Sequence, residues 1–309
     1  MIMSVVEMQF RPDRAPLVSP GAMDLHEHDM TATFATDVVL AEAQGKLAEI
    51  GQWLAVDGDP AASLGRLVEI NSTGPLRLGF GAWRDLLLGC QFENGRGELI
   101  TVGGRTVKNV AGYDVTKLMV GQGGELGRIV TLTMRTYRRP AGVLVARFGE
   151  VPHVLSQLLL SAQRPQYALL TARGLACGYL GDSRTLEHYQ SVLPGIGAVS
   201  VETRTLEQDM QDRAATWIWG RAETFRTAVP PMRVREFVER ASLVDSWAAD
   251  AAFGIVVGAA READRARLAA AAAHVGGSVY FIDDQGRLKW DVPPGLAGIV
   301  GNIKAAFGK

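Results

Sequence analysis

Seven glycines gather between residues 103 and 127, around a short apolar segment, in the sequence GGRTVKNVAGYDVTKLMVGQGGELG. Residues without a Cβ let a backbone approach a ligand closely and present its N–H groups to an anion. Gly121, Gly123 and Gly127 form GxGxxxG, which is near the dinucleotide fingerprint GxGxxG. That fingerprint follows a strand and opens a helix, whereas this one follows the helix-like segment 114–120 and precedes a strand. A Rossmann nucleotide site is therefore not predicted.

Other kinds of reaction centre lack their signatures in this chain. Neither GxxxxGK[ST] nor GxSxG occurs, so a P-loop and a serine hydrolase elbow are not predicted. His26 and His28 flank Glu27, but two histidines without further ligands are more typical of a solvated surface than of a metal site. Cys90 and Cys177 form no CxxC or Cys/His spacing, which argues against a disulfide framework or a zinc site. We assign no catalytic and no metal-binding residue.

Composition narrows the class of protein and of partner. With 309 residues, of which 47% are hydrophobic and 21% charged, the chain is long enough for two domains with separate cores. A net charge of -1 and a pI near 6.5 give no electrostatic reason to expect nucleic acid or an anionic membrane as partner. The longest apolar run, at 251–260, is too short to span a bilayer. We expect a cytoplasmic protein without a direct membrane span.

Periodicity divides the chain into a tail and two domains, predicted at residues 1–20, 21–140 and 141–309. The boundary near Pro140 follows an alternating strand and precedes a change from glycine-rich turns to regular elements. The first domain is predicted to contain a strand at 31–36, a helix at 40–50 capped by Asp37 and ended by Gly51, turns and short strands over 58–127, and a strand at 130–134.

The second domain alternates strand and helix signals through two rounds. Its predicted strands are 143–148, 166–172, 216–220, 252–259 and 278–282. Its predicted helices are 151–162, 231–244 and 262–274. This order indicates an α+β fold in which helices cover a mostly antiparallel, ferredoxin-like sheet.

Two quoted stretches carry a family resemblance: LGRLVEINSTGPLRLGFGAWRDLLLG at 64–89, and GGRTVKNVAGYDVTKLMVGQGGELGRIVTLTMR at 103–135. They resemble the FAD-binding subunit of glycolate oxidase complexes, within the FAD-linked oxidase family. KNVAGYD and TKLMVG are the most specific pieces, and the resemblance runs from about residue 24 to 302–307. It implies the vanillyl-alcohol-oxidase fold: a PCMH-type FAD-binding domain followed by an α+β cap domain.

The resemblance also implies a cofactor and the residues beside it. In this fold FAD lies extended between two α+β subdomains, and backbone N–H groups hold its pyrophosphate and isoalloxazine edge. Asp114 could equally cap a helix at 115–120. The cofactor-binding residues that the resemblance implies are Ser63, Leu64, Gly65, Asn71, Ser72, Gly74, Gly79, Asp85, Asn109, Gly112, Tyr113, Asp114, Gly127 and Ile129.

The sequence departs from the family pattern where the phosphates would bind. Only about twenty residues precede the matching segment, without the family's glycine-rich pyrophosphate loop, so the PCMH-type domain is expected to lack much of its first subdomain. Arg66 replaces a second glycine, and Glu69 and Glu125 replace small residues. Two carboxylates beside a diphosphate would repel it, which argues against tight FAD binding, while Arg66 would partly compensate.

Two functions are compatible with these residues. In the first, the chain is the FAD-binding subunit of a glycolate oxidase-type complex and relays electrons from the oxidation of 2-hydroxy acids. In the second, it is a structural subunit that binds FAD weakly or not at all. In both, the resemblance implies two partners: a sibling FAD subunit, which carries the histidine-rich substrate site, and an iron-sulfur subunit. It allows peripheral contact with the inner membrane through that complex.

Overall fold

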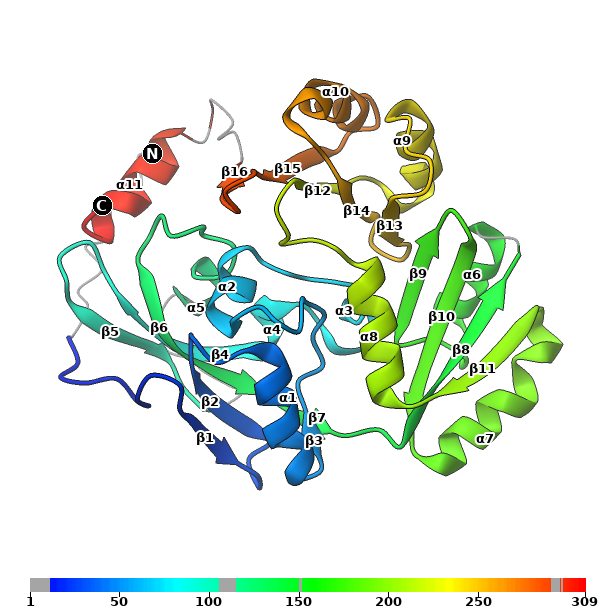
Figure 1. The fold of residues 1–309 in the computed structure, drawn as a ribbon, viewed down its shortest axis with the longest axis horizontal. Helices are drawn as coiled ribbons and strands as arrows, with labels where there is room; N and C mark the ends of the chain where they lie inside the picture. Colours follow the sequence, from blue (N-terminus) through cyan, green and yellow to red (C-terminus); the bar gives the residue numbers. More distant parts are fainter. Residues whose placement is uncertain (1–11, 106–114, 150–151, 290–294, 296) are drawn as a thin grey trace.

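Two sheets organise the protein, in a computed structural model that describes residues 12–105, 115–149, 152–289, 295 and 297–309 (Figure 1). The first sheet is five-stranded, in the order β1-β2-β6-β4-β5, and the second is nine-stranded. The first sheet comprises Met23–His26 (β1), Thr31–Ala35 (β2), Leu87–Glu93 (β4), Leu99–Gly103 (β5) and Arg128–Arg135 (β6). A two-stranded ribbon joins Gln52–Trp53 (β3) to Tyr137–Arg138 (β7).

The first sheet is antiparallel and buries its centre. Strands β2 and β6 pair with Thr33 opposite Thr133, and their hydroxyl oxygens lie 3.0 Å apart. Phe34 and Leu132 are fully buried in the core beneath helix α1. The helices of this part are Leu40–Glu49 (α1), Leu64–Glu69 (α2), Arg77–Phe80 (α3), Trp83–Leu86 (α4) and Val115–Leu118 (α5).

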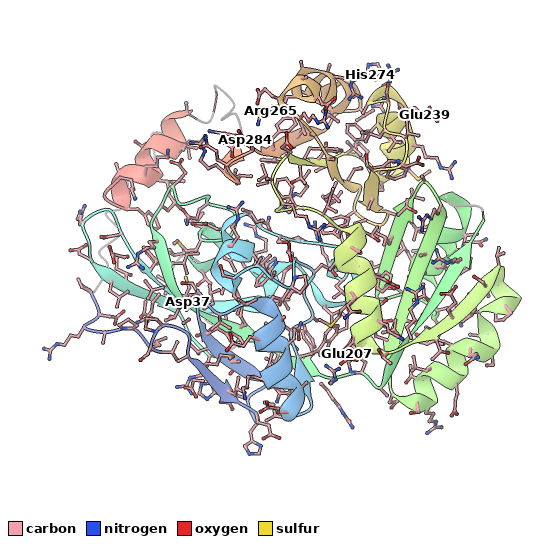
Figure 2. All side chains as sticks on the ribbon, in the orientation of Figure 1. Asp37, Glu207, Glu239, Arg265, His274 and Asp284 are labelled. Carbon is pink, nitrogen blue, oxygen red and sulfur yellow. The ribbon has the colours of Figure 1, made fainter. Side chains whose placement is uncertain are left out.

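The predicted strands at 31–36 and 130–134 are confirmed, and so is the helix that follows the first of them. Gly51, at a φ of 68°, ends that helix as predicted. The predicted cap was wrong, because α1 begins after Val39 without a side-chain cap. Asp37, which precedes the start of α1 (Figure 2), instead accepts a hydrogen bond from the Gly21 N–H at 2.9 Å. Asp37 therefore fixes the lead-in to the sheet rather than the helix.

The second sheet consists of two ferredoxin-like βαββαβ units, which confirms the predicted α+β, ferredoxin-like class. Each unit has the spatial order 4-1-3-2, as β11-β8-β10-β9 and as β15-β12-β14-β13, with β16 added at one edge. The units join where β9 pairs with β13. The strands are Gly142–Phe148 (β8), Tyr167–Thr171 (β9), Gly174–Gly181 (β10), Ser200–Arg204 (β11), Thr224–Ala228 (β12), Trp247–Asp250 (β13), Ile255–Ala259 (β14), Ser278–Ile282 (β15) and Leu288–Lys289 (β16).

Four helices cover one face of the second sheet: Pro152–Leu160 (α6), Ser183–Val192 (α7), Val234–Arg240 (α9) and Arg265–His274 (α10). Side-chain alternation along the strands separates the two faces. On β8, Leu144 and Ala146 point into the helix-covered core. Val143 and Val145 point the other way, toward the first sheet. There they join a third hydrophobic core, called the seam here, in which residues of the first part such as Trp53 pack on the second sheet.

One helix of the seam was not predicted, and one predicted strand was wrong. Helix α8 spans Leu206–Thr216 and stands between α1 and the second sheet (Figure 1). The strand predicted at 216–220 is a turn after this helix. Its tryptophans alternate in sequence as they would in a strand, but both are buried in the seam because Trp217 caps α8 and Trp219 packs on Ile70.

The C-terminal helix Ala297–Ala306 (α11) returns to the first sheet (Figure 1). Phe307 is fully buried in the first core, and its ring centroid lies 5.4 Å from that of Phe92. The Phe307 carbonyl accepts a hydrogen bond from the Gly95 N–H at 2.9 Å. The predicted domain boundary at residue 140 stays a prediction. The last described segment, 297–309, follows this boundary in sequence but packs on the first sheet, which precedes the boundary.

Candidate functional site

Helix α2 carries the first three candidate cofactor residues. The Ser63 hydroxyl accepts a hydrogen bond from the Arg66 N–H at 3.3 Å and so caps the helix. The N–H groups of Leu64 and Gly65 donate to carbonyls of the loop after β2, at 2.8 and 2.9 Å. These donors bind the chain itself, so the start of α2 does not present them to a ligand.

The four described candidate glycines share another property: each faces another part of the protein at a distance that leaves no room for a side chain. Contacts of 3 Å or less with a Cβ would force a neighbour to move. An added Cβ would lie 2.7 Å from Thr36 Cβ at Gly65, 2.6 Å from Asp57 Oδ2 at Gly74, 2.9 Å from Gln166 Cα at Gly79, and 2.6 Å from the Glu93 carbonyl oxygen at Gly127. Internal packing therefore accounts for all four glycines.

Asn71 and Ser72 form the turn after α2. Asn71 has a positive φ of 50°, and its carbonyl accepts a hydrogen bond from Arg226 Nη1 at 2.6 Å. The Ser72 N–H donates to the Leu67 carbonyl at 2.8 Å. Its hydroxyl is fully buried and has no partner among the described residues. The turn thus docks onto β12 of the second sheet.

The remaining described candidates also act within the chain. The Asp85 carboxylate accepts from the Ala82 N–H at 2.9 Å and stabilises the start of α4. Ile129 is buried, and its carbonyl accepts from the Thr36 hydroxyl at 3.2 Å. Four other candidates lie outside the described residues: Asn109, Gly112, Tyr113 and Asp114.

Each of the two predicted acids beside the cofactor path is attracted by a cation of this chain. Glu125 forms an ion pair with Lys304 of α11. Burial raises the pKa of Glu69, although the nearby Arg66 opposes this. Arg66 donates a hydrogen bond to the Gly286 carbonyl beyond β15. Charges and backbone donors in the described part of this region are thus used internally, and they do not form a cradle that fits a diphosphate.

A buried polar network at the seam was missed by the sequence reasoning. Arg213 of α8 pairs with Asp57 through Nη1 and with Asp209 through Nε at 2.9 Å. The Tyr167 hydroxyl donates to Asp209 at 2.5 Å, and the Leu76 N–H donates to Asp57 at 2.7 Å. The spacing of Asp209 and Arg213, one helical turn apart, was the available signal.

Burial and mutual attraction set the charges of this network. Burial raises the pKa of Asp57, against the attraction of Arg213. Burial disfavours the Arg213 cation, but Asp57 and Asp209 together raise its pKa above the ordinary value. Burial and Asp209 raise the pKa of Tyr167 well above its usual range. Neither Arg213 nor Tyr167 releases a proton near neutral pH, so the network connects the two sheets rather than performing acid-base chemistry.

A second arginine crosses the seam from β12. Arg226 binds the Asn71 carbonyl and lies over the rings of Trp219 and Tyr280, at 5.6 and 5.8 Å from their centroids. The Trp219 indole N–H donates to the Ile70 carbonyl at 3.2 Å. Burial lowers the pKa of Arg226 to about 10. Two side chains of the second sheet region thus bind the carbonyls at the end of α2.

The histidines and cysteines have ordinary surroundings. His26 Nε2 lies 3.1 Å from Asp24 Oδ2, and the His26 Nδ1 lies 3.2 Å from Arg105 Nη1. Within the described ranges, no group of three or more His, Cys, Asp or Glu side chains could hold a metal ion. Cys90 and Cys177 are free and buried in different cores. No helix among the residues placed by the structure is long and apolar enough to cross a membrane.

Known proteins resemble this chain over part of their length. The glycolate oxidase subunit GlcE of Escherichia coli (strain K12) is 36% identical over 121 residues, which are 38% of this chain and 34% of that protein. The mitochondrial D-lactate dehydrogenase (cytochrome) of Arabidopsis thaliana is 30% identical over 122 residues, 40% of this chain and 22% of that protein. The D-2-hydroxyglutarate dehydrogenase of Stutzerimonas stutzeri (strain A1501) is 30% identical over 129 residues, 41% and 28% of the two chains. No protein-family model matches.

A solved structure resembles nearly the whole fold. An alkyldihydroxyacetonephosphate synthase superposes with a TM-score of 0.63 at 12% identity, over 92% of this chain and 64% of that one. The sequence matches span about a fifth to a third of the curated relatives. Together these matches confirm the predicted resemblance to glycolate oxidase subunits and the predicted PCMH-type fold class.

Proposed function

We propose that this chain, a relative of the FAD-linked glycolate oxidase and D-lactate dehydrogenase proteins, is a subunit of an FAD-linked oxidoreductase complex that oxidises 2-hydroxy acids. The observation that carries the proposal is the 36% identity over 121 residues to the glycolate oxidase subunit GlcE. The other relatives are named for lactate and 2-hydroxyglutarate, which share the 2-hydroxy acid group with glycolate. In this role the chain relays electrons from the oxidised substrate.

The proposed partners are a sibling FAD subunit and an iron-sulfur subunit. Oxidising a 2-hydroxy acid requires a group that removes the hydroxyl proton and cations that hold the carboxylate. The histidines described above form no such cluster, so the proposal places substrate chemistry on the sibling subunit. The absence of a disulfide or zinc spacing around Cys90 and Cys177 supports a cytoplasmic complex, which would touch the inner membrane peripherally through its other subunits.

The proposed FAD contacts of this chain fall on Asn109, Gly112, Tyr113 and Asp114. These residues belong to the KNVAGYD motif, the most specific part of the resemblance. The described candidates, by contrast, bind and pack against the protein itself. FAD would supply the electron-accepting isoalloxazine ring, and residues of this chain would form one wall beside it.

A second candidate function is favoured by that same packing. The N–H groups at the start of α2 donate hydrogen bonds within the chain. At Gly65 and Gly127, other atoms of the protein occupy the space that a side chain would need. A subunit built in this way serves assembly and holds no flavin of its own. The two functions differ in one measurable property, the uptake of FAD.

Flavin absorption decides between them. The chain is purified alone and together with its partner subunits, and its visible spectrum is recorded before and after addition of FAD. The electron-relay function predicts a flavin spectrum that Asn109→Ala weakens. A chain that stays colourless in the complex and takes up no added FAD contradicts it and leaves the assembly function.

Charge repulsion is tested on the same preparation. Glu69→Ala combined with Glu125→Thr removes the two carboxylates that would repel a diphosphate, and FAD affinity should rise because Arg66 then lacks its nearest carboxylate. Glu207→Ala, on α8 and remote from α2, is the matched control (Figure 2). Equal FAD affinity in the original chain and the double variant would rule out repulsion as the reason for weak binding.

A further inference from the structure

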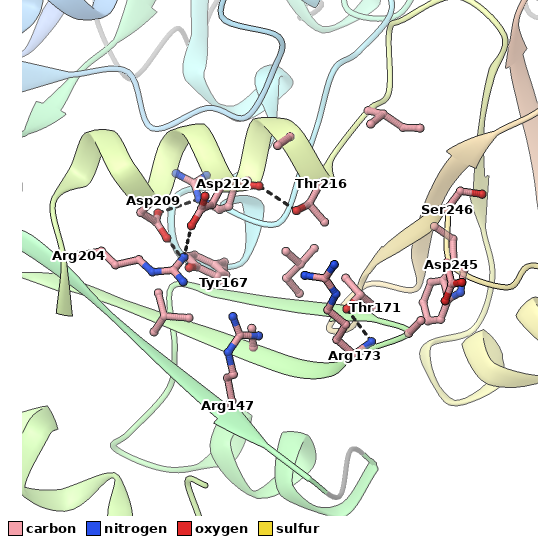
Figure 3. A pocket seen from close by; sticks show the side chains of 18 residues that line it. Arg147, Tyr167, Thr171, Arg173, Arg204, Asp209, Asp212, Thr216, Asp245 and Ser246 are labelled. Carbon is pink, nitrogen blue, oxygen red and sulfur yellow. Dashed lines mark hydrogen bonds and ion pairs between the residues drawn. The ribbon is translucent and has the colours of Figure 1, made fainter. Parts of the chain in front are cut away.

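A large cavity lies on the second sheet. It has a volume of about 930 Å³, within the range of about 300–1,000 Å³ that is typical of small-molecule sites. Figure 3 shows it between helix α8 and the open face of the first ferredoxin-like unit. All of its lining residues fall within 145–247. None of the described candidate cofactor residues, and no residue of α2, lines it.

The floor of this cavity is apolar and belongs to the sheet. Four strands contribute side chains to the same face, as the period of two requires. The floor residues are Val145 on β8, Leu169 on β9, Ala176 on β10 and Trp247 on β13, with Ile218 after α8. A ligand with an apolar body would cover this surface and remove it from water.

The rim carries two arginines for which the described residues provide no ion pair shorter than 4.0 Å. Arg147 reaches Glu202 only at 4.0 Å. Arg173, on the turn between β9 and β10, has no ion pair in the part of the chain that the structure describes. Figure 3 shows both guanidinium groups directed from the strands into the space beneath α8. Among the described residues, neither arginine has a carboxylate closer than 4.0 Å, so both have room to bind an anion.

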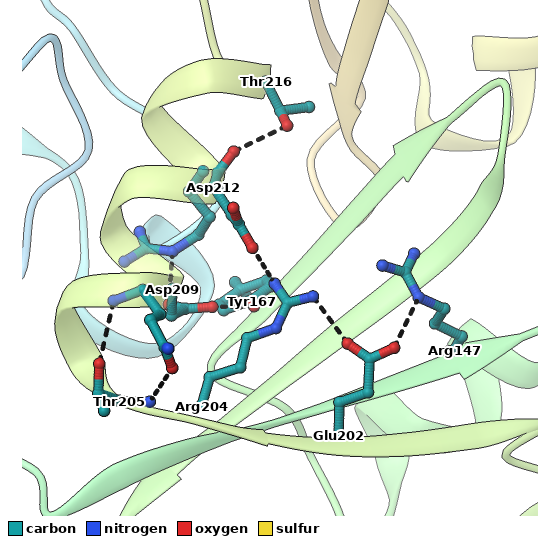
Figure 4. Close-up of polar contacts among 10 residues, drawn as sticks. Arg147, Tyr167, Glu202, Arg204, Thr205, Asp209, Asp212 and Thr216 are labelled. Carbon is teal, nitrogen blue, oxygen red and sulfur yellow. Dashed lines mark hydrogen bonds and ion pairs between the residues drawn. The ribbon is translucent and has the colours of Figure 1, made fainter.

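Arg204, by contrast, has two close carboxylate partners. Arg204 binds Glu202 at 2.7 Å and also pairs with Asp212 of α8, as Figure 4 shows. Glu202 therefore divides its attraction between two arginines, and Arg204 holds the nearer position. Asp245 lies at the far end of the cavity beside Ser246 (Figure 3). The least neutralised positive charge of the cavity is therefore that of Arg147 and Arg173.

We propose that this cavity binds an amphipathic organic anion, whose carboxylate or phosphate head is held by Arg147 and Arg173 while its apolar body lies on the sheet. Guanidinium groups form paired hydrogen bonds with both kinds of head. The flat floor between α8 and β13 accommodates a linear or planar apolar group. The site is independent of flavin and of the proposed oxidoreductase role.

Titration calorimetry with the full chain tests the site with four probes: decanoate, decyl phosphate, decanol and inorganic phosphate. Decanoate or decyl phosphate, or both, should bind at least about tenfold more tightly than decanol, because decanol lacks the charge. Their ratio distinguishes a carboxylate site from a phosphate site. Inorganic phosphate should bind at least about tenfold more weakly than decyl phosphate, because it cannot use the floor.

Charge-removing variants connect the affinity to these residues. Arg147→Gln with Arg173→Gln should weaken binding of the preferred anion at least about tenfold and leave decanol unchanged. Arg128→Gln with Arg184→Gln removes two arginines outside the cavity and is the control. Arg173→Gln alone, on an exposed turn, serves if the double variant does not fold. Equal binding of decanoate, decyl phosphate and decanol, equal binding of inorganic phosphate and decyl phosphate, or unchanged affinity in the variants would overturn the proposal.

Discussion

Two arginines cross the seam from the C-terminal half to the first part of the chain, and their surroundings are opposite. Arg213 is 3% exposed and contacts two carboxylates, Asp57 and Asp209. Arg226 binds a carbonyl and lies over two aromatic rings, and no carboxylate pairs with it among the residues that the structure describes. The pKa of Arg213 is raised above its ordinary value, whereas that of Arg226 is lowered.

The difference teaches which seam contacts depend on charge. Removing one member of a buried ion pair leaves its partner charged and desolvated, which costs more than the pair contributes. The folded protein already includes the cost of desolvating an arginine that has no counter-ion. Removing that arginine leaves no buried carboxylate without a partner. We therefore expect the Arg213 network to control the docking of the two sheets, and Arg226 to contribute mainly one hydrogen bond and ring packing.

The largest effect should follow Arg213→Met, which keeps the aliphatic stem and removes the charge. Asp57 and Asp209 would remain buried without their cation, so the free energy of unfolding should fall by about 3–5 kcal/mol. Urea unfolding at neutral pH measures it. Adding Asp57→Asn to this variant should restore part of the loss, because one stranded carboxylate is removed. A loss below about 1 kcal/mol for Arg213→Met would remove the contrast between the two arginines.

Asp250 extends the comparison to a buried anion without a cation at ion-pair distance. It is 1% exposed, and its Oδ2 has no partner in the described structure. Burial raises the pKa of Asp250 to about 7, from 3.8. As the pH rises between these values, the unfolded state loses this proton first, so Asp250 destabilises the fold progressively. Below the lower value and above the upper one, its contribution is constant.

Asp250→Asn should remove this pH dependence. Relative to the original chain, the variant should gain about 2–3 kcal/mol of stability between pH 5 and pH 8, measured by urea unfolding at each pH. Asp182→Asn is a control of opposite sign, because hydrogen bonds from Thr185 lower the pKa of Asp182. Its variant should lose stability relative to the original chain as the pH rises through the acidic range. Parallel pH curves for Asp250→Asn and the original chain would show that Asp250 titrates normally.

The sequence predicted strands more successfully than the seam, for a physical reason. Val130, Leu132 and Met134 alternate with polar residues, and that pattern is visible without coordinates. The structure buries the polar face of this strand as well, at Thr131 and Thr133. Helix α8 lacks such a pattern because its buried face is polar: Asp209 and Arg213 point inward. Besides the spacing of Asp209 and Arg213, its local signal was the capping box that Thr205 forms with Gln208.

At the candidate site, too, the sequence does not reveal contacts between residues that lie far apart in the chain. The sequence reveals that Gly79 has no side chain, but Gln166, which occupies the space beside it, is far along the chain. The sequence therefore does not distinguish a glycine that faces a cofactor from a glycine that faces another part of the protein. The family resemblance located the right segment of the fold, and coordinates were needed to see that its described glycines pack against the protein.

Gly65→Ala tests whether α2 is fixed by this packing, independently of the arginine that binds its far end. A methyl group 2.7 Å from Thr36 Cβ should lower the free energy of unfolding by about 1–3 kcal/mol. Gly45→Ala is the matched control, because Gly45 lies within α1 and faces open space. Alanine there should raise stability by about 0.5–1 kcal/mol. If Gly65→Ala is also stabilising, Gly65 has room for a side chain, and the assignment of this glycine to packing fails.

The smallest effect should follow Arg226→Met. The variant loses the hydrogen bond to Asn71, worth about 1 kcal/mol, and the attraction to the rings of Trp219 and Tyr280. It gains because a buried guanidinium with an unpartnered Nε no longer has to be desolvated. These contributions oppose one another, so the free energy of unfolding should change by no more than about 1 kcal/mol. A loss as large as that of Arg213→Met would mean that Arg226 has a counter-charge in the folded protein, and the seam would then rest on two charge networks instead of one.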